Sequence, residues 1–172
     1  DADIIVRDSI EELFSEDFDG CPIAAVKDDL ASNSFNAGVM LIDVEAWRRE
    51  GITDKLLQLT NEFHESSYGD QGILNRLFQN NWKRLPKKYN FMVGMDTFAR
   101  NYGIDSWYSD SLMVENEAKI IHYTVNNPWH LVNLNRFREE WWYYYGLEWS
   151  EIVMRRMNFE KGLNSLIHEQ QY

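Results

Sequence analysis

Short apolar runs and helically spaced apolar positions alternate along the chain. The runs are Ile4 to Val6, Ile23 to Val26 and Phe35 to Val44. Apolar runs of this length between polar residues predict strands, and the longest is typical of a strand buried on both faces of a sheet. Lys119 to Thr124 is a further strand candidate by the same criterion.

Two segments between these runs carry apolar residues three or four positions apart, which predicts amphipathic helices. One lies between Thr53 and His64, and the other follows Gly69-Asp70. Their apolar positions are Leu56, Leu57, Leu59 and Phe63 in the first, and Ile73, Leu74, Leu77 and Phe78 in the second.

Two further segments are predicted to be helical. Ser9 with Glu12 has the spacing of a capping box and predicts a helical turn that contains Leu13. Residues 136 to 172 carry apolar positions at helical spacing and predict a helical tail. Strands that alternate with helices predict a layered α/β domain, and no internal repeat or linker divides it.

Composition and charge narrow the function classes. With 172 residues, of which 44% are hydrophobic, the chain is long enough for one domain with its own core. Its net charge of -11 opposes binding to nucleic acid, so we expect no nucleic-acid partner, but it does not oppose a divalent cation. The single cysteine, Cys21, cannot form an intrachain disulfide, so a cytoplasmic location fits best.

The candidate chemistry begins at Asp1-Ala2-Asp3. In an extended segment, residues i and i+2 point to the same side, so Asp1 and Asp3 can share one cation. Carboxylate oxygens suit Mg²⁺ or Mn²⁺. A solvated acidic segment is the plain alternative. His122, at the end of a predicted strand, is either a metal ligand or a core histidine.

Five segments in this order resemble the family 8 retaining glycosyltransferases of the GT-A fold. They are Asp1 to Val6, Phe35 to Val39, Gly69 to Gly72, Ile121 to Thr124, and Pro128-Trp129. The resemblance covers residues 1 to about 130. It implies an α/β GT-A-type nucleotide-diphospho-sugar transferase domain, whose later part, a mixed sheet with flanking helices, is residues 1–133. Residues 134–172 are then expected to form a helical C-terminal tail that packs on it.

The resemblance also implies roles for particular residues. Asp1, Asp3 and His122 match the ligands of Mn²⁺ (or Mg²⁺) and of the nucleotide diphosphate. Donor-sugar contacts fall on Asn36, Ala37, Asp70 and Gln71, with Asp70 and Gln71 as the catalytic pair, and Asp28 matches a position near the acceptor.

The residues by themselves leave plainer alternatives open. Asn36 is equally a turn residue, Asp70 an N-cap, and Asp28 an exposed carboxylate at a strand end. Retention of configuration has two routes: a double displacement assisted by Gln71, or same-face attack. A neutral amide is a poor nucleophile, which favours same-face attack with Gln71 stabilising the transition state.

The implied activity is transfer of glucose or galactose from a UDP-hexose to a hydroxyl of a growing oligosaccharide or glycan. A non-catalytic carbohydrate- or partner-binding protein with the same fold is the alternative. Val125 and Asn127 motivate it, because many members have Gly and Lys there, in contact with the diphosphate. A metal-dependent phosphoesterase fits less well, since the ligands suffice for one metal only. We expect the uracil and ribose contacts to precede Asp1, which makes this chain alone inactive.

An aromatic run characterises the tail. Trp141 to Tyr145, with Trp149, Arg155 and Arg156, suits either packing on the domain or a weak peripheral contact with the inner face of the cell membrane. Neighbouring glutamates would weaken an attraction to anionic lipid, which favours packing.

Overall fold

The chain forms two compact units, Asp1–Asn135 and Arg136–Tyr172. The structure is a computed structural model that describes residues 1–29, 33–63, 69–103, 117–125, 127–130, 135 and 137–169. The predicted boundary between residues 133 and 134 lies outside these residues and stays a prediction.

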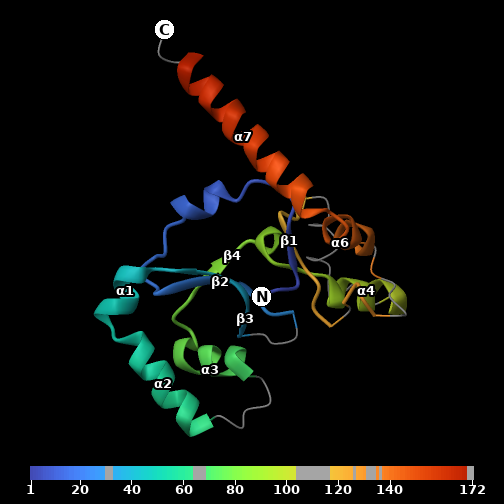
Figure 1. The fold of residues 1–172 in the computed structure, drawn as a ribbon. Coiled ribbons are helices and arrows are strands. Elements are labelled where there is room, and N and C mark those ends of the chain that lie inside the picture. Colours follow the sequence, from blue (N-terminus) through green and yellow to red (C-terminus); the bar gives the residue numbers. More distant parts are fainter. Residues whose placement is uncertain are drawn as a thin grey trace. The chain divides into compact units, whose positions relative to one another are not determined.

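The first unit contains the strands β1 (Ile4–Val6), β2 (Ile23–Lys27), β3 (Phe35–Ile42), β4 (Lys83–Leu85), β5 (Phe91–Met92) and β6 (Ile120–His122). Its helices are α1 (Val44–Arg49), α2 (Ile52–Phe63), α3 (Gly69–Phe78) and α4 (Val93–Tyr102), with the 3-10 turns η1 (Glu11–Ser15) and η2 (Lys87–Tyr89). Figure 1 shows α1, α2 and α3 beside β2 and β3.

The strands form two three-stranded sheets, with the orders β1-β6-β5 and β3-β2-β4. In the first, β1 is antiparallel to β6 and β5 is parallel to it. In the second, β2 pairs antiparallel with β3 and parallel with β4. Both sheets are therefore mixed, and the predicted α/β fold class is confirmed.

Strand β2 is the buried centre of its sheet, because its two faces enter two different hydrophobic clusters. Ile23 and Ala25 pack with residues of α1, α2 and α3, whereas Ala24 and Val26 pack with Leu13, η2 and β5. The prediction that the Phe35 to Val44 strand is buried on both faces is wrong for its second half, since that half is only partly buried.

That strand also ends two residues earlier than predicted. Asp43 caps α1: its Oδ1 accepts hydrogen bonds from the backbone N–H groups of Glu45 and Ala46 at 3.0 and 2.9 Å. A capping side chain stops the extended backbone and starts the helix, so Val44 belongs to α1.

The capping box is wrong in detail, although the helical turn exists as η1. Ser9 Oγ accepts from the N–H of Glu11 at 3.3 Å and is not the N-cap. Glu12 instead lies 3.0 Å from Lys88 Nζ and 2.7 Å from Lys119 Nζ. Chiefly because of Lys119, the pKa of Glu12 is lowered to about 2. Glu12 therefore ties η1 to η2 and to the start of β6.

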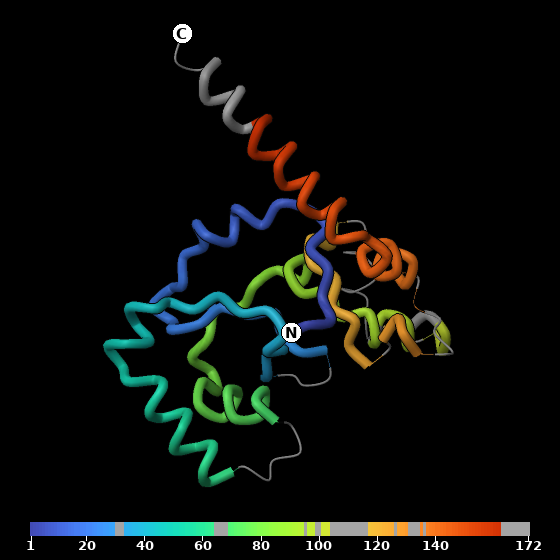
Figure 2. Tube along the Cα trace, in the orientation of Figure 1, coloured from blue at the N-terminus to red at the C-terminus, as the bar shows by residue number. Residues whose placement is uncertain are grey.

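The Asp1–Asp3 segment joins the two sheets. The N–H of Tyr123, just after β6, donates to the carbonyl of Asp3 at 2.9 Å. The backbone nitrogen of Asp1 donates to the carbonyl of Gly38, in β3, at 2.8 Å. Figure 2 accordingly places the N-terminal end of the trace near β3. The two aspartates thus lie where β6 and β3 approach each other.

The second unit is helical, as the sequence predicts, with α6 (Arg138–Tyr145) and α7 (Trp149–Glu169). Arg155 donates a hydrogen bond to the hydroxyl of Tyr143, which links the two helices. Within the described part of the chain, no helix is both long and apolar enough to cross a membrane. Packing of this tail on the first unit, and contact with a membrane, stay predictions.

Candidate functional site

Asp1, Asp3 and His122 form a cluster whose potential ligand atoms all lie within 4.8 Å of one another. His122 Nε2 is 3.2 Å from Asp1 Oδ2 and 3.4 Å from Asp3 Oδ1. The register of β1 and β6 explains this meeting, because Ile4 lies opposite His122 and puts Asp3 beside it. Two carboxylates and one imidazole are a suitable donor set for Mn²⁺ or Mg²⁺.

The His122 ring is buried, with 2% of the residue exposed. Burial lowers the pKa of the imidazole, and the nearby Asp3 carboxylate only partly opposes this effect. The neutral form that a metal ligand requires is therefore favoured. On its other side, His122 Nδ1 lies 2.9 Å from Asn90 Oδ1.

A chain of amide side chains continues from this histidine. Asn90 Nδ2 donates to Asn36 Oδ1 at 2.8 Å, and Asn36 Nδ2 donates to Gln71 Oε1 at 3.2 Å. Gln71 Nε2 then donates to Asp28 Oδ2 at 3.0 Å. The structure thus connects the metal-ligand candidates to three of the residues expected around the sugars.

The backbone takes part in this network at the start of β3. The N–H of Ala37 donates to Gln71 Oε1 at 3.1 Å, and the N–H of Gly38 donates to Asn36 Oδ1 at 3.0 Å. Asn36 is therefore a strand residue with a buried, bonded side chain, and the plainer turn interpretation is wrong. Asp28 is also buried, at 8% exposed, so it is not an exposed carboxylate at a strand end.

Asp70 lies apart from this network. It is exposed in the first turn of α3, and its Oδ1 accepts from the N–H of Gln71 at 2.9 Å. Because α3 begins at Gly69, Asp70 is inside the helix and is not its N-cap. It lines a cavity of about 420 Å³ between α2 and α3, whose other lining residues are Leu56, Thr60, Phe63, Gly69, Ile73 and Leu74.

Gly38 lets the His122 ring approach β3. A Cβ atom at this position would lie 2.3 Å from His122 Cε1, 2.7 Å from His122 Nδ1 and 2.9 Å from Asn36 Oδ1. Such contacts are far below van der Waals distances, so only glycine fits here.

Val125, one of the two departures from the family pattern, has a left-handed backbone with φ 63°. Glycine adopts this conformation freely, whereas a β-branched residue is strained in it. The residue is 75% exposed. The backbone of Val125 therefore has a conformation that glycine, the residue expected here from the resemblance, would adopt without strain.

Asn90 is the residue that sequence reasoning misses. It is fully buried, with 0% exposed, and it contacts both His122 and Asn36. Its only signal is its place directly before the apolar residues of β5, where an asparagine would ordinarily be interpreted as a turn residue.

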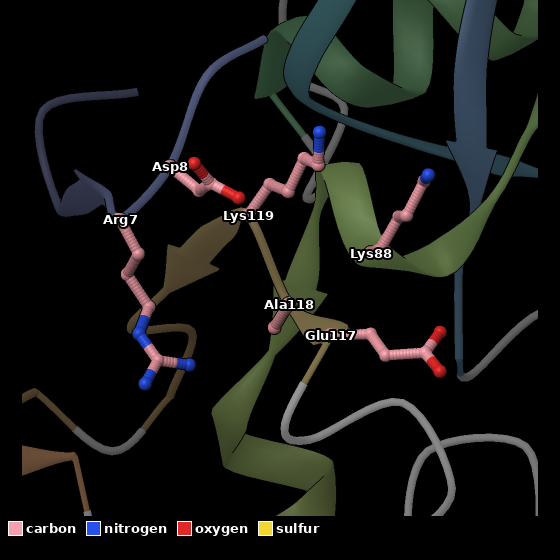
Figure 3. A pocket seen from close by; sticks show the side chains of 6 residues that line it. All are labelled: Arg7, Asp8, Lys88, Glu117, Ala118 and Lys119. Atoms are coloured by element: carbon pink, nitrogen blue, oxygen red, sulfur yellow. The ribbon is translucent and has the colours of Figure 1, made fainter.

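A second cavity, of about 510 Å³, lies at the opposite end of β1 and β6 (Figure 3). Its lining residues are Arg7, Asp8, Lys88, Glu117, Ala118 and Lys119. In Figure 3, Lys88 and Lys119 extend in one direction and Arg7 in the other. Both lysines are paired with Glu12, whose single negative charge offsets one of their two positive charges. This cavity shares no residue with the metal-ligand candidates.

Comparisons with known proteins agree with the geometry. The chain is 46% identical to glycosyltransferase GlyB of Streptococcus pneumoniae over 172 residues, which is 98% of this chain and 43% of that protein. It is 29% identical to the lipopolysaccharide 1,2-glucosyltransferase of Escherichia coli, over 76% of this chain and 35% of the relative. The chain therefore spans less than half the length of these curated relatives.

Several solved structures share its fold. The glycosyltransferase GlyE of Streptococcus pneumoniae superposes with a TM-score of 0.77 at 33% identity, covering 92% of this chain and 42% of the other. The galactosyltransferase LgtC, in complex with donor and acceptor sugar analogues, gives a TM-score of 0.63 at 27% identity, over 80% and 56% of the two chains. The family model for glycosyl transferase family 8 matches residues 1–132. With its α/β fold of mixed sheets, this chain belongs to glycosyl transferase family 8.

Proposed function

We propose that the protein transfers a hexose from a UDP-hexose to a hydroxyl of a growing glycan, with retention of configuration and with Mn²⁺ or Mg²⁺ as cofactor. The observation that carries this proposal is the continuous hydrogen-bonded chain from the Asp1, Asp3 and His122 cluster to Gln71 and Asp28. This network supports the proposal because it holds the proposed cation ligands and the proposed sugar-binding amides at a fixed separation, as transfer from a nucleotide sugar requires.

Asp1, Asp3 and His122 would hold the cation. A bound divalent cation supplies electrostatic stabilisation of the negative charge on the departing diphosphate. The fit rests on the donor set, which combines two acidic side chains with an imidazole that burial keeps neutral. Val125 and Asn127 provide no charged side chain toward the diphosphate. The cation would therefore provide most of the stabilisation of the negative charge on the departing diphosphate.

Gln71 would stabilise the transition state and not attack the sugar. Its Oε1 accepts hydrogen bonds from both Asn36 Nδ2 and the N–H of Ala37. These donors occupy the two lone pairs of the amide oxygen and reduce its nucleophilicity, which is low for any neutral amide. This supports same-face attack by the acceptor hydroxyl, with the departing phosphate taking its proton.

The amides and Asp28 would bind the two sugars. In this proposal Asn36 and Ala37 meet the donor sugar. Asp28, which accepts a hydrogen bond from Gln71 Nε2, is a carboxylate that can also accept from an acceptor hydroxyl. Asp70 is proposed to hold donor hydroxyls from the start of α3. Glucose or galactose is the proposed donor hexose, because the named relatives include a glucosyltransferase and a galactosyltransferase.

The proposal is tested by UDP release from a UDP-hexose by the full-length protein, with and without Mn²⁺ and with and without a glycan acceptor. We expect release that requires the metal, rises with acceptor and disappears with a chelator. Binding of sugar without any metal-dependent release would favour the non-catalytic alternative, which Val125 and Asn127 motivate.

Gln71→Ala should lower the turnover number by about 10²- to 10³-fold, the range for loss of a group that stabilises a transition state. Donor affinity should fall much less. Turnover measured at saturating donor, together with donor calorimetry, checks this. Arg76→Ala is the matched control: it lies on the same helix, stacks on Phe63, and should leave turnover unchanged. Equal losses of affinity and turnover would indicate a plain binding role for Gln71.

A further inference from the structure

We propose that Asn90 is a positioning residue that fixes the tautomer of His122, so that the Nε2 lone pair faces Asp1 and Asp3. The tautomer itself is a property of the metal-free protein. Its consequence, tighter cation binding, rests on the proposed function. The inference rests on three hydrogen-bond assignments. The first follows from backbone N–H donors, whose direction is certain, and each of the other two follows from the one before it.

The first assignment is the orientation of the Asn36 amide. The backbone N–H of Gly38 lies 3.0 Å from one end of this amide, and a backbone N–H can only donate. That end must be the oxygen, Oδ1. The other end, Nδ2, then donates to Gln71 Oε1, which the N–H of Ala37 independently identifies as an oxygen.

The second assignment is the orientation of Asn90. Its side chain lies 2.8 Å from Asn36 Oδ1, which is an acceptor, so the nearer atom of Asn90 must be the donor Nδ2. The flipped amide would set two oxygens against each other. With 0% of Asn90 exposed, water cannot relieve that contact.

The third assignment is the proton on His122. Because Asn90 Nδ2 faces Asn36, Asn90 Oδ1 faces His122 Nδ1 at 2.9 Å, so Nδ1 must carry the proton and donate the hydrogen bond. A neutral imidazole carries one N–H, so Nε2 is left with its lone pair. This is the nitrogen that lies near both carboxylates of the cluster.

Asn90 thereby opposes the Nε2–H tautomer, which the nearby carboxylates would favour. Asp1 Oδ2 and Asp3 Oδ1, at 3.2 and 3.4 Å from Nε2, would attract a proton to that nitrogen. A proton there would form hydrogen bonds to the carboxylates and block coordination. By accepting a hydrogen bond from Nδ1–H, Asn90 holds the single proton of the neutral ring on the opposite side and keeps Nε2 available for a cation, as the partners of metal-bound histidines do.

The same amide supports the sugar-binding residues. Its Nδ2 donates a hydrogen bond to Asn36 Oδ1, and Asn36 Nδ2 in turn donates one to Gln71 Oε1. One buried side chain therefore orients a metal-ligand candidate through its oxygen and a donor-sugar candidate through its nitrogen.

The test is ¹⁵N NMR of the histidine side chains in the metal-free, full-length protein, at a pH where His122 is neutral, with His122→Gln to assign the signal. We expect a protonated Nδ1 and an unprotonated Nε2 in the wild-type protein. In Asn90→Ala the Nε2–H tautomer should become dominant, and Mn²⁺ affinity, measured by calorimetry, should fall about 10- to 100-fold. Asn90→Asp keeps an acceptor for Nδ1–H and should keep the wild-type tautomer.

Asn75→Ala is the matched control. Asn75 also makes hydrogen bonds through both ends of its amide, to the backbone of Phe35 and Gln71, but it does not contact His122. The Asn75→Ala substitution should lower the stability of the protein and leave the tautomer of His122 unchanged. An Nε2–H tautomer in the wild-type protein or in Asn90→Asp, or an unchanged tautomer in Asn90→Ala, would overturn the proposal. If the tautomers are as expected but the protein does not turn over UDP-hexose, the proposed function is contradicted and the role of Asn90 is not.

Discussion

Asp3→Ala is expected to abolish Mn²⁺-dependent binding of a UDP-sugar to the full-length protein with little change in its fold. The substitution removes one of three potential ligands of a single-metal site, and the loss should exceed the ~10- to 100-fold effect of removing an outer partner of a ligand. The fold should persist because the side chain is only partly buried, and the carbonyl of Asp3 still accepts from the N–H of Tyr123.

His122→Ala should abolish the same binding but also lower stability. The ring is buried, so its removal leaves a cavity and deprives Asn90 Oδ1 of its donor, which costs about 1–3 kcal/mol for the unsatisfied oxygen. Calorimetric titration of UDP with and without Mn²⁺, combined with urea unfolding, separates the two effects. Asp54→Ala, which removes an exposed carboxylate of α2, is the control. Unchanged Mn²⁺-dependent UDP affinity in both variants would exclude this metal site.

Gly38→Ala should be nearly as damaging, although it adds only a methyl group. The new Cβ would lie 2.3 Å from His122 Cε1, and the ring cannot move aside easily because its surroundings are packed and Asn90 holds its Nδ1. Overpacking of this kind lowers the free energy of unfolding by about 1–3 kcal/mol. Whichever group moves, His122 or Asn36 leaves its place, so we expect loss of both metal and donor affinity.

Gly162→Ala provides the matched control for this substitution. Gly162 lies in α7 with open space around its Cα, so a methyl group there meets no atom within 4 Å. The helical position should even gain about 0.5–1 kcal/mol, since alanine is the better helix former. Thermal unfolding and Mn²⁺ calorimetry of both variants make the comparison. Wild-type metal affinity in Gly38→Ala would show that the His122 ring does not depend on this close approach.

Most of the helices and strands, and the residues of the candidate metal site, could be predicted from the sequence alone. Ile4–Val6 and Ile23–Lys27 are strands, and Ile52–Phe63 and Gly69–Phe78 are helices, close to the predicted ranges. Apolar periodicity is a local property that burial of one face demands, so it can be recognised without knowing the partner. The ordered motifs likewise pointed to family 8, which the comparisons confirm.

Local patterns gave wrong answers where a side-chain hydrogen bond or ion pair favoured another conformation. Ser9 and Glu12 have the spacing of a capping box, but Glu12 binds Lys88 and Lys119, more than 70 residues away in the chain. The apolar run after Phe35 continues to Val44, but the Asp43 cap ends the strand at Ile42. In both cases a hydrogen bond or an ion pair decides between conformations that periodicity cannot distinguish.

The contacts between the residues of the candidate site depend on the three-dimensional fold and could not be predicted from the sequence. Asn90 meets His122 across 32 positions and Asn36 across 54, and Gln71 meets Asp28 across 43. No local preference of an asparagine indicates which amide end it will present, or to which residue, because that depends on which strands lie side by side. The sequence therefore identified Asp1, Asp3 and His122 as potential metal ligands, whereas the sheet register and the buried amides decided that they meet and which nitrogen of His122 faces the carboxylates.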